Sequence, residues 1–335
     1  MNVCGDRRIR AVAWALAGIL VVVGVGVMLA GGDAAATVSG AARAAADAHW
    51  AVVPAVTALV VAHFWFAAVA LRGAAGKPMP LLHATMAQFT GATANRITGG
   101  GLGTVAVNAR YLTGRGVPAS EAVAVAGVLQ VGGAVADLIL FAIVVPVALA
   151  TGDRALLSEV HISRTMLVIA GVAVLAAAVA AWFLRDRMRG PIEVCARMLR
   201  RPGDMLVMMA ASAATTLMMA VAFAVSMLAV PGAVTPAQFG TLIVVYMIGA
   251  AAGGVVPGPG GLGSTEAALV ALLAAIGVGT VGALSGVLIF RAISHWAPVP
   301  IGLLAAGTVR KPKTATVAAL PVREKQDAVV VAQAA

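Results

Sequence analysis

Long apolar runs, separated by short polar or glycine-rich turns, make up most of this chain. A helix needs about 20 apolar residues to cross about 30 Å of hydrocarbon, and several runs reach that length. The pattern predicts an all-α, polytopic transmembrane helical bundle with about six full spans, at residues 11–31, 49–71, 119–149, 165–184, 205–230 and 281–308. Between the first two spans, we expect residues 32–48 to form a loop of small residues on the outer side of the membrane.

Two further apolar segments, 80–113 and 239–277, differ from the spans because each contains the sequence Gly-Gly-Leu-Gly. Glycine clusters break helices, and lipid tolerates broken backbone only where it is buried in protein or lines a watery cavity. Matching breaks in the two halves of a membrane protein point to the central binding site of a transporter. We therefore predict two re-entrant or broken-helix hairpins. Arms that cross the membrane completely would fit the same end positions.

Basic residues set the expected orientation. They gather between the spans, most densely at 185–201, and the positive-inside rule places such segments in the cytoplasm. This orientation predicts a bacterial plasma-membrane protein with both termini in the cytoplasm and hairpins that enter from opposite sides. The result is an inverted repeat of about 49–149 and 205–308 in one transmembrane domain, 1–313, followed by a disordered cytoplasmic tail, 314–335. The first apolar run could instead be a cleaved signal peptide, but its length favours a retained span.

Composition excludes several classes of function. The chain is 61% apolar and 11% charged, with a mean hydropathy of +1.00. The net charge of +10 follows from the basic loops and does not indicate a nucleic-acid partner. The sequence has no P-loop, zinc-spaced ligand cluster or nucleophile elbow, and Cys4 and Cys195 give no disulfide framework. We therefore expect no enzymatic activity, no cofactor and no metal, and we expect the basic segment to touch anionic lipid.

Two arginines lie at membrane depth. Arg96 is on the first arm of the first hairpin, and Arg291 is ten residues into the last span. Charges at such depth are costly and usually face a cavity or a partner. His295 follows Arg291 by one helical turn, so the two lie on the same face. The alternatives are a structural pair for Arg96 and a helix-bridging hydrogen bond for His295.

Two carboxylates accompany these cations. Asp137 lies near the middle of its span with Gln130 on the same face, and it could balance one of the arginines, relay protons or form a packing ion pair. Glu266 lies in the first turn after the second glycine cluster, where the helix dipole favours a carboxylate. We assign Asp137, Glu266 and His295 to gating or charge balance, with helix capping alone as the alternative for Glu266.

The glycine turns leave free backbone N–H groups at the start of a half-helix, and such groups attract anions. Two of these ends near two arginines predict a pocket for a phospholipid or polyprenyl-phosphate head group. The alternative is close helix packing through small residues, which we expect for Gly249/Gly253 and Gly282/Gly286. The predicted substrate-binding residues are Asn95, Arg96, Gly100, Gly101, Gly103, Thr104, Arg110, Gly260, Gly261, Gly263, Ser264 and Arg291.

The motifs in the two hairpins and the last span resemble those of one family. The first signature of the lysylphosphatidylglycerol synthase transmembrane-region family is similar to Asn-Arg-Ile-Thr-Gly-Gly-Gly-Leu-Gly at 95–103 and Asn-Ala-Arg-Tyr-Leu at 108–112. Its second signature resembles Val-Pro-Gly-Pro-Gly-Gly-Leu-Gly-Ser-Thr-Glu at 256–266. The arginine and aromatic residue that the family usually carries in its last span correspond to Arg291 and Trp296.

This resemblance implies an integral membrane protein. Its best-known relative is the flippase half of the multiple peptide resistance factor, which moves aminoacylated phosphatidylglycerol and leaves aminoacyl transfer to a separate soluble domain. We expect no such domain in the short segment after residue 313. The chain departs from the family where Gly99 replaces a frequent proline. It departs again where Gly133 and Ala134 replace a Glu-Arg pair, so that only Asp137 of that element remains.

Our leading interpretation is a lipid flippase or transporter whose partners are membrane lipids with an anionic head group. The alternative is a non-transporting scaffold that recruits a cytoplasmic lipid-modifying enzyme through the basic segment. A third interpretation, an intramembrane synthase, would need Asp137 and His295 as its acid and base.

Overall fold

The computed structural model describes residues 32–98, 101–150, 189–255 and 263–307. Within these ranges every regular element is a helix, so the all-α prediction is confirmed. Five helices are long and apolar enough to cross a membrane, and the chain is a multi-pass membrane protein. These five candidates are Trp50–Ala75, Ala119–Ala148, Pro202–Leu228, Pro236–Gly253 and Thr280–Ala305.

The long helices fall where the apolar runs predicted them. They are α3 (Val53–Ala75), α6 (Ala119–Ala150), α10 (Pro202–Leu228) and the final stretch of α13 (Thr280–Arg291), η5 (Ala292–Trp296) and α14 (Pro298–Ala305). The predicted spans at 11–31 and 165–184 lie outside the described residues. The fifth candidate, Pro236–Gly253, comes from a segment assigned to a hairpin, and its 18 residues extend about 27 Å. That arm is therefore nearly long enough to cross the membrane.

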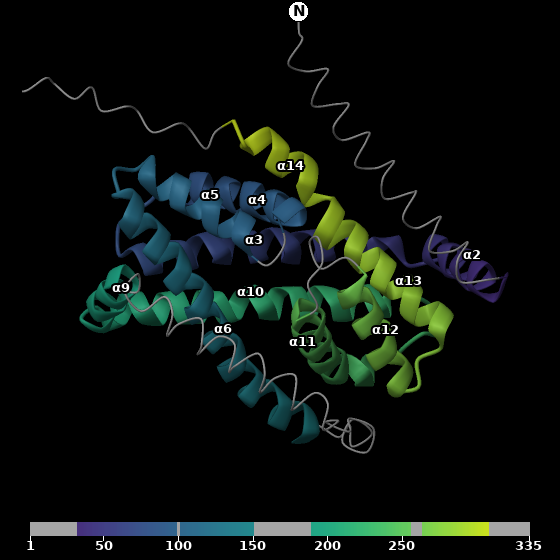
Figure 1. Cartoon of the computed structure of the whole chain (residues 1–335). Helices are drawn as coiled ribbons and strands as arrows, with labels where there is room; N and C mark the ends of the chain where they lie inside the picture. Colours follow the sequence, from purple (N-terminus) through teal and green to yellow (C-terminus); the bar gives the residue numbers. More distant parts are fainter. Residues whose placement is uncertain (1–31, 99–100, 151–188, 256–262, 308–335) are drawn as a thin grey trace, which may run out of the picture.

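The described halves repeat one order of elements, a long helix, a helical hairpin and a long helix. In the first half α4 (Leu81–Thr98) and α5 (Leu102–Thr113) form the hairpin, between α3 and α6. In the second half α11 (Phe239–Val255) and α12 (Ser264–Ala275) form it, between α10 and α13. Helices α3 and α10 pack along each other through the middle of the bundle (Figure 1). The opposite sense of the two halves remains a prediction.

The second arm of each hairpin is short. Helices α5 and α12 have 12 residues each, so each extends about 18 Å, less than the roughly 30 Å of a hydrocarbon core. Each begins after a glycine with positive φ, 79° at Gly101 and 86° at Gly263, which L side chains rarely adopt. A Cβ at Gly103 would clash with the backbone of α4, and a Cβ at Gly253 would clash with Thr265 of α12. Both hairpins thus depend on small residues for close packing.

The same packing explains the spaced glycines outside the turns. Gly249 faces Leu269, Gly282 faces Ala233, and a Cβ at Gly286 would overlap the side chain of Met227. The prediction that Gly249/Gly253 and Gly282/Gly286 are packing faces is therefore confirmed.

The prediction of a loop at 32–48 is wrong. These residues form helix α2 (Gly32–Ala46), because alanine has the highest helix propensity and dominates the segment. Helix α2 packs on α13, where the buried Ser285 hydroxyl donates to the Ala41 carbonyl at 3.0 Å. The reading of 185–201 as a basic loop also needs correction. Helix α9 (Arg189–Leu199) occupies most of it, and its Val194 and Met198 are buried against the bundle.

An aromatic cluster packs three helices of the second half together near the end of α13. Phe223 of α10, Tyr246 of α11 and Phe290 of α13 lie with ring centroids 5.5 to 5.7 Å apart. Phe223 and Phe290 are almost fully buried, and such aromatic pairs add about 0.5–1.5 kcal/mol each beyond their area. Arg291 directly follows Phe290, so this cluster fixes the position of a charged side chain inside the bundle.

Candidate functional site

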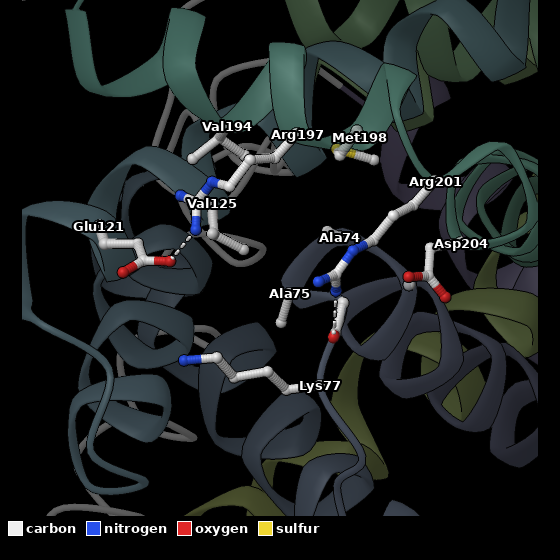
Figure 2. Close-up of a pocket in the computed structure, with 12 residues that line it drawn as sticks. Ala74, Ala75, Lys77, Glu121, Val125, Val194, Arg197, Met198, Arg201 and Asp204 are labelled. Carbon is white, nitrogen blue, oxygen red and sulfur yellow. Dashed lines mark hydrogen bonds and ion pairs between the residues drawn. The ribbon is translucent and has the colours of Figure 1, made fainter.

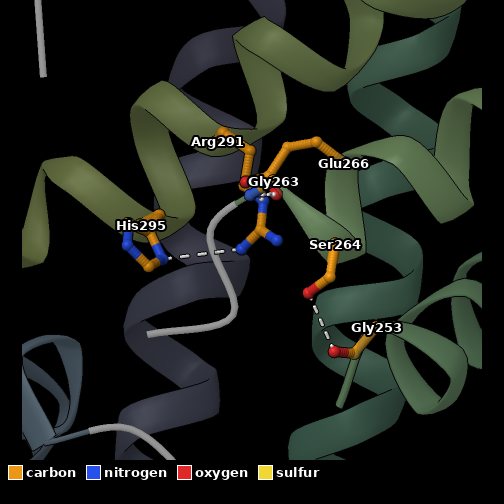
Figure 3. A network of polar contacts seen from close by, with 6 residues as sticks. All are labelled: Gly253, Gly263, Ser264, Glu266, Arg291 and His295. Atoms are coloured by element: carbon orange, nitrogen blue, oxygen red, sulfur yellow. Dashed lines mark hydrogen bonds and ion pairs between the residues drawn. The ribbon is translucent and has the colours of Figure 1, made fainter. Parts of the chain in front are cut away.

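An ion pair joins the second hairpin to the last long helix. Arg291 Nε lies 2.8 Å from Glu266 Oε1, and the two side chains are only 15% and 23% exposed (Figure 3). The other carboxylate oxygen, Oε2, accepts a hydrogen bond from the Gly263 N–H at 2.8 Å. Glu266 therefore caps α12 and balances Arg291 at the same time. The Ser264 hydroxyl adds a second tie, because it donates to the Gly253 carbonyl of α11 at 3.0 Å.

His295 lies beside this pair in a π-helical turn. Arg291 Nη1 is 3.5 Å from His295 Nδ1, as the one-turn spacing predicted (Figure 3). The ring is 8% exposed and meets Trp296 edge to face, with centroids 5.1 Å apart. Its Nε2 is buried and has no hydrogen-bond partner within the described part of the chain. Pro298 and Pro300 follow at once, and their missing N–H groups account for the break in the regular helix.

Arg96 reaches this region from the first hairpin. It lies in the last turn of α4, close enough to Arg291 and His295 for electrostatic interaction. The Arg96 Nε is buried, and among the described residues it has no hydrogen-bond partner. Asn95 Oδ1, from the same turn, is also buried without a partner there. The two halves of the chain therefore bring the guanidinium groups of Arg96 and Arg291 within electrostatic range of each other.

The remaining predicted residues divide into three groups. Gly101, Gly103 and Thr104 lie at the start of α5, where they shape the hairpin and pack it on α4. Arg110 is exposed near the other end of α5, away from the glycine turn. The free N–H groups predicted at the second turn are partly occupied, because Glu266 already accepts from Gly263. Three predicted residues, Gly100, Gly260 and Gly261, lie outside the described residues.

Asp137 occupies a different environment from the arginines. The Thr216 hydroxyl of α10 donates to its Oδ1, and within the described ranges Asp137 has no ion pair with Arg96 or Arg291. Asp137 and Gln130 line one cavity of about 390 Å³ between α3, α4, α5, α6 and α10, as their shared face predicted. Gly133 and Ala134 also line this cavity. The space stays open because Gly133 has no side chain and Ala134 has only a methyl group.

The sequence analysis missed most of this polar cavity. Gln88 and Asn108 are almost fully buried on the two arms of the first hairpin, and Gln88 Nε2 donates to Asn108 Oδ1 at 2.8 Å. His63 and Ser212 reach the cavity from α3 and α10. Single polar residues inside apolar runs were the available signal, since buried polar groups in lipid need partners.

A second cavity, of about 180 Å³, lies at the opposite end of the bundle beside α9 (Figure 2). Arg197 forms an ion pair with Glu121 of α6, and Arg201 Nη1 donates to the Gly76 carbonyl at 3.0 Å. Lys77 points into the same space. Two of the arginines in the basic segment are thus engaged by the chain itself.

The described residues contain no group of three or more His, Cys, Asp and Glu side chains that could hold a metal ion. The Arg96–Arg291 site offers charge and hydrogen-bond donors. Guanidinium groups suit phosphate and carboxylate because their N–H donors form planar, paired hydrogen bonds.

Comparison with known proteins identifies the family of this chain. No curated protein matches the sequence. Residues 13–302 match the family described as Lysylphosphatidylglycerol synthase TM region, and this range includes both hairpins, the two arginines and His295. The chain belongs to the lysylphosphatidylglycerol synthase transmembrane-region family.

Proposed function

We propose that this protein is a flippase for lipids with an anionic head group, and that Arg96 and Arg291 bind the anion. Membership of the family supports a role in membrane lipid biology. One observation carries the proposal: Arg96 and Arg291, one from each half of the chain, lie within electrostatic range of each other, while Glu266 pairs with Arg291.

The charge count favours an anionic ligand. A buried charge is costly unless it is paired, and like charges repel strongly where water is scarce. Glu266 balances Arg291, which leaves the charge of Arg96 without a partner among the described residues. A phosphate group would supply the missing negative charge and accept hydrogen bonds from both side chains.

The hairpins offer a route for such a head group. Broken backbone at membrane depth is stable only against protein or water, so a polar path beside the hairpins is compatible with the bilayer. In this proposal the lipid head group moves past the Arg96–Arg291 site while its acyl chains stay in the hydrocarbon. The short arms α5 and α12 are the elements that open and close the path.

The test is lipid movement in proteoliposomes. The purified protein is reconstituted with fluorescent phosphatidylglycerol, and dithionite quenching measures how fast the label crosses the bilayer. We expect Arg96→Gln and Arg291→Gln to slow movement about tenfold or more, because each removes a charge-assisted hydrogen bond worth about 1.5–3 kcal/mol. Arg43→Gln is the matched control, because Arg43 is exposed on α2. Equal rates in wild type and both site variants would contradict the anion-binding role.

A further inference from the structure

The Asp137 cavity has chemistry opposite to that of the arginine site. It holds about 390 Å³ within the helical bundle, and its polar lining residues include His63, Gln88, Asn108, Gln130 and Ser212. A space of this size with several polar groups can hold ordered water. Among the described residues that line it, Asp137 is the one acidic side chain.

Asp137 forms no ion pair with a basic side chain among the residues that the structure describes. Of the helices packed against α6, α10 provides the Thr216 hydroxyl, and α5 provides the neutral Asn108. Tyr246 of α11 is close enough for electrostatic interaction with Asp137. The nearest described ion pair on α6, Glu121 with Arg197, lies 16 residues away, about 24 Å along the helix.

His63 of α3 is the other titratable group of the cavity. Its Nδ1 lies 3.0 Å from the Thr215 carbonyl oxygen, which can only accept a hydrogen bond. Nδ1 therefore carries the hydrogen, and in the neutral ring Nε2 keeps a free lone pair. Neither Thr215 nor His63 brings a fixed positive charge to Asp137.

We propose that Asp137 is the proton-binding site of the transport cycle, a role that rests on the proposed function. An unpaired carboxylate at membrane depth is costly, whereas the neutral acid is tolerated. Asp137 takes a proton from water in the cavity, forming an O–H bond, and returns it to water when the cavity faces the other side. The bond from Thr216 holds the carboxylate in place in both forms.

The geometry links this proton site to the anion site. Gln88 and Ala92 line the cavity from one face of α4, and Arg96 is the next residue along that face. Gly101, at the start of α5, contacts Gln130 on the cavity wall. A displacement of the first hairpin therefore alters both sites, which provides the physical basis for coupling lipid movement to a proton gradient.

Carbodiimide labelling tests the proton site without requiring transport. N,N′-dicyclohexylcarbodiimide modifies protonated carboxyl groups in apolar surroundings, and peptide mass spectrometry locates the product. We expect Asp137 to be labelled near pH 6, with labelling falling several-fold by pH 9 and equal in sodium and choline buffers. Glu266, whose carboxylate is engaged by Arg291 in an ion pair, is the internal control.

The variants make this test decisive. Asp137→Asn removes the label, and Thr216→Val, which deletes the hydroxyl that stabilises the carboxylate, extends labelling to higher pH. Absence of label at Asp137 at every pH would overturn the proposal, and protection by sodium alone would replace the proton with a sodium ion.

Transport against a pH gradient separates this proposal from the proposed function. In wild-type proteoliposomes we expect a gradient of two pH units to change the flipping rate several-fold, and in Asp137→Asn we expect no response. If the flipping rate does not depend on the gradient in either protein, the proton role is overturned and the flippase proposal stands. No lipid movement in wild type overturns the flippase, while labelling still decides whether Asp137 binds a proton.

Discussion

The two hairpins share a backbone design but differ in how they handle charge. Each has a second arm of 12 residues that starts at a glycine with positive φ and packs closely on the first arm. In the second hairpin Glu266 forms an ion pair with Arg291, whereas Arg96 of the first hairpin forms no ion pair within the described residues. The comparison teaches that similar hairpin backbones can hold a paired charge in one half of the chain and, among the described residues, an unpaired charge in the other.

The largest expected loss of stability comes from removing the carboxylate that pairs with Arg291. Glu266→Gln leaves Arg291 buried without its counter-ion and removes the cap of α12, so it should destabilise the protein by about 3–5 kcal/mol. Arg96→Gln removes a charge that has no counter-ion to lose, so it should leave stability equal or improved. Thermal unfolding in detergent measures both. A larger loss of stability for Arg96→Gln than for Glu266→Gln would reverse the comparison.

The next largest loss of stability should come from placing a methyl group between the two arms of a hairpin. Gly103→Ala and Gly253→Ala each place a methyl group against the facing arm, which should cost about 1–3 kcal/mol. Gly127→Ala on α6 is the matched control, because a Cβ there meets nothing within 4 Å and alanine favours the helix by about 1 kcal/mol. Unfolding midpoints of the three variants give the ranking, and a stabilised Gly103→Ala would show that the arms are less tightly packed than described.

Substitution of the two glycines that precede the short arms should destabilise the protein by different amounts. Gly101→Ala and Gly263→Ala both force alanine into positive φ, at a cost of about 1–2 kcal/mol. Gly101→Ala should cost more, because its Cβ would also meet Gln130, whereas a Cβ at Gly263 meets none of the described residues within 4 Å. The difference between their free energies of unfolding isolates the contact with the cavity wall, and equal losses would exclude that contact.

The smallest effect belongs to the ion pair at the far end of the bundle. Arg197 and Glu121 have side chains 55% and 24% exposed, so Arg197→Gln should cost less than about 1 kcal/mol. High salt should remove that difference, while the loss in Glu266→Gln should persist. Unfolding at low and high ionic strength separates the two, and salt sensitivity at Glu266 would mean that its pair is open to water.

The sequence predicted local features of the fold well and tertiary pairings poorly. The apolar runs located α3, α6 and α10, and the glycine clusters located both hairpin turns, because helix formation and helix breaking depend on nearby residues. Helix α2 was missed because its small residues have low hydropathy, although alanine favours a helix.

Pairings across the chain depend on how helices pack. The contact of Arg291 with His295 follows from their spacing of four residues. The carboxylate partner of Arg291 does not follow from spacing: Asp137 was the predicted counter-charge for one of the arginines, but the turn at Gly263 directs Glu266 toward α13. Asp137 meets Thr216, a neutral residue 79 positions away, which no local pattern indicates.

The last helix has a mechanical consequence for the first hairpin. Gly302 of α14 lies so close to α4 that a Cβ would overlap the Phe89 carbonyl and Thr93, and the Thr90 hydroxyl donates to the Gly302 carbonyl at 3.2 Å. We therefore expect α4 and α14 to tilt together as one rigid unit. The irregular turn at Ala292–Trp296, which separates α14 from α13, is then the hinge. Such a tilt would turn the imidazole of His295 relative to Arg291.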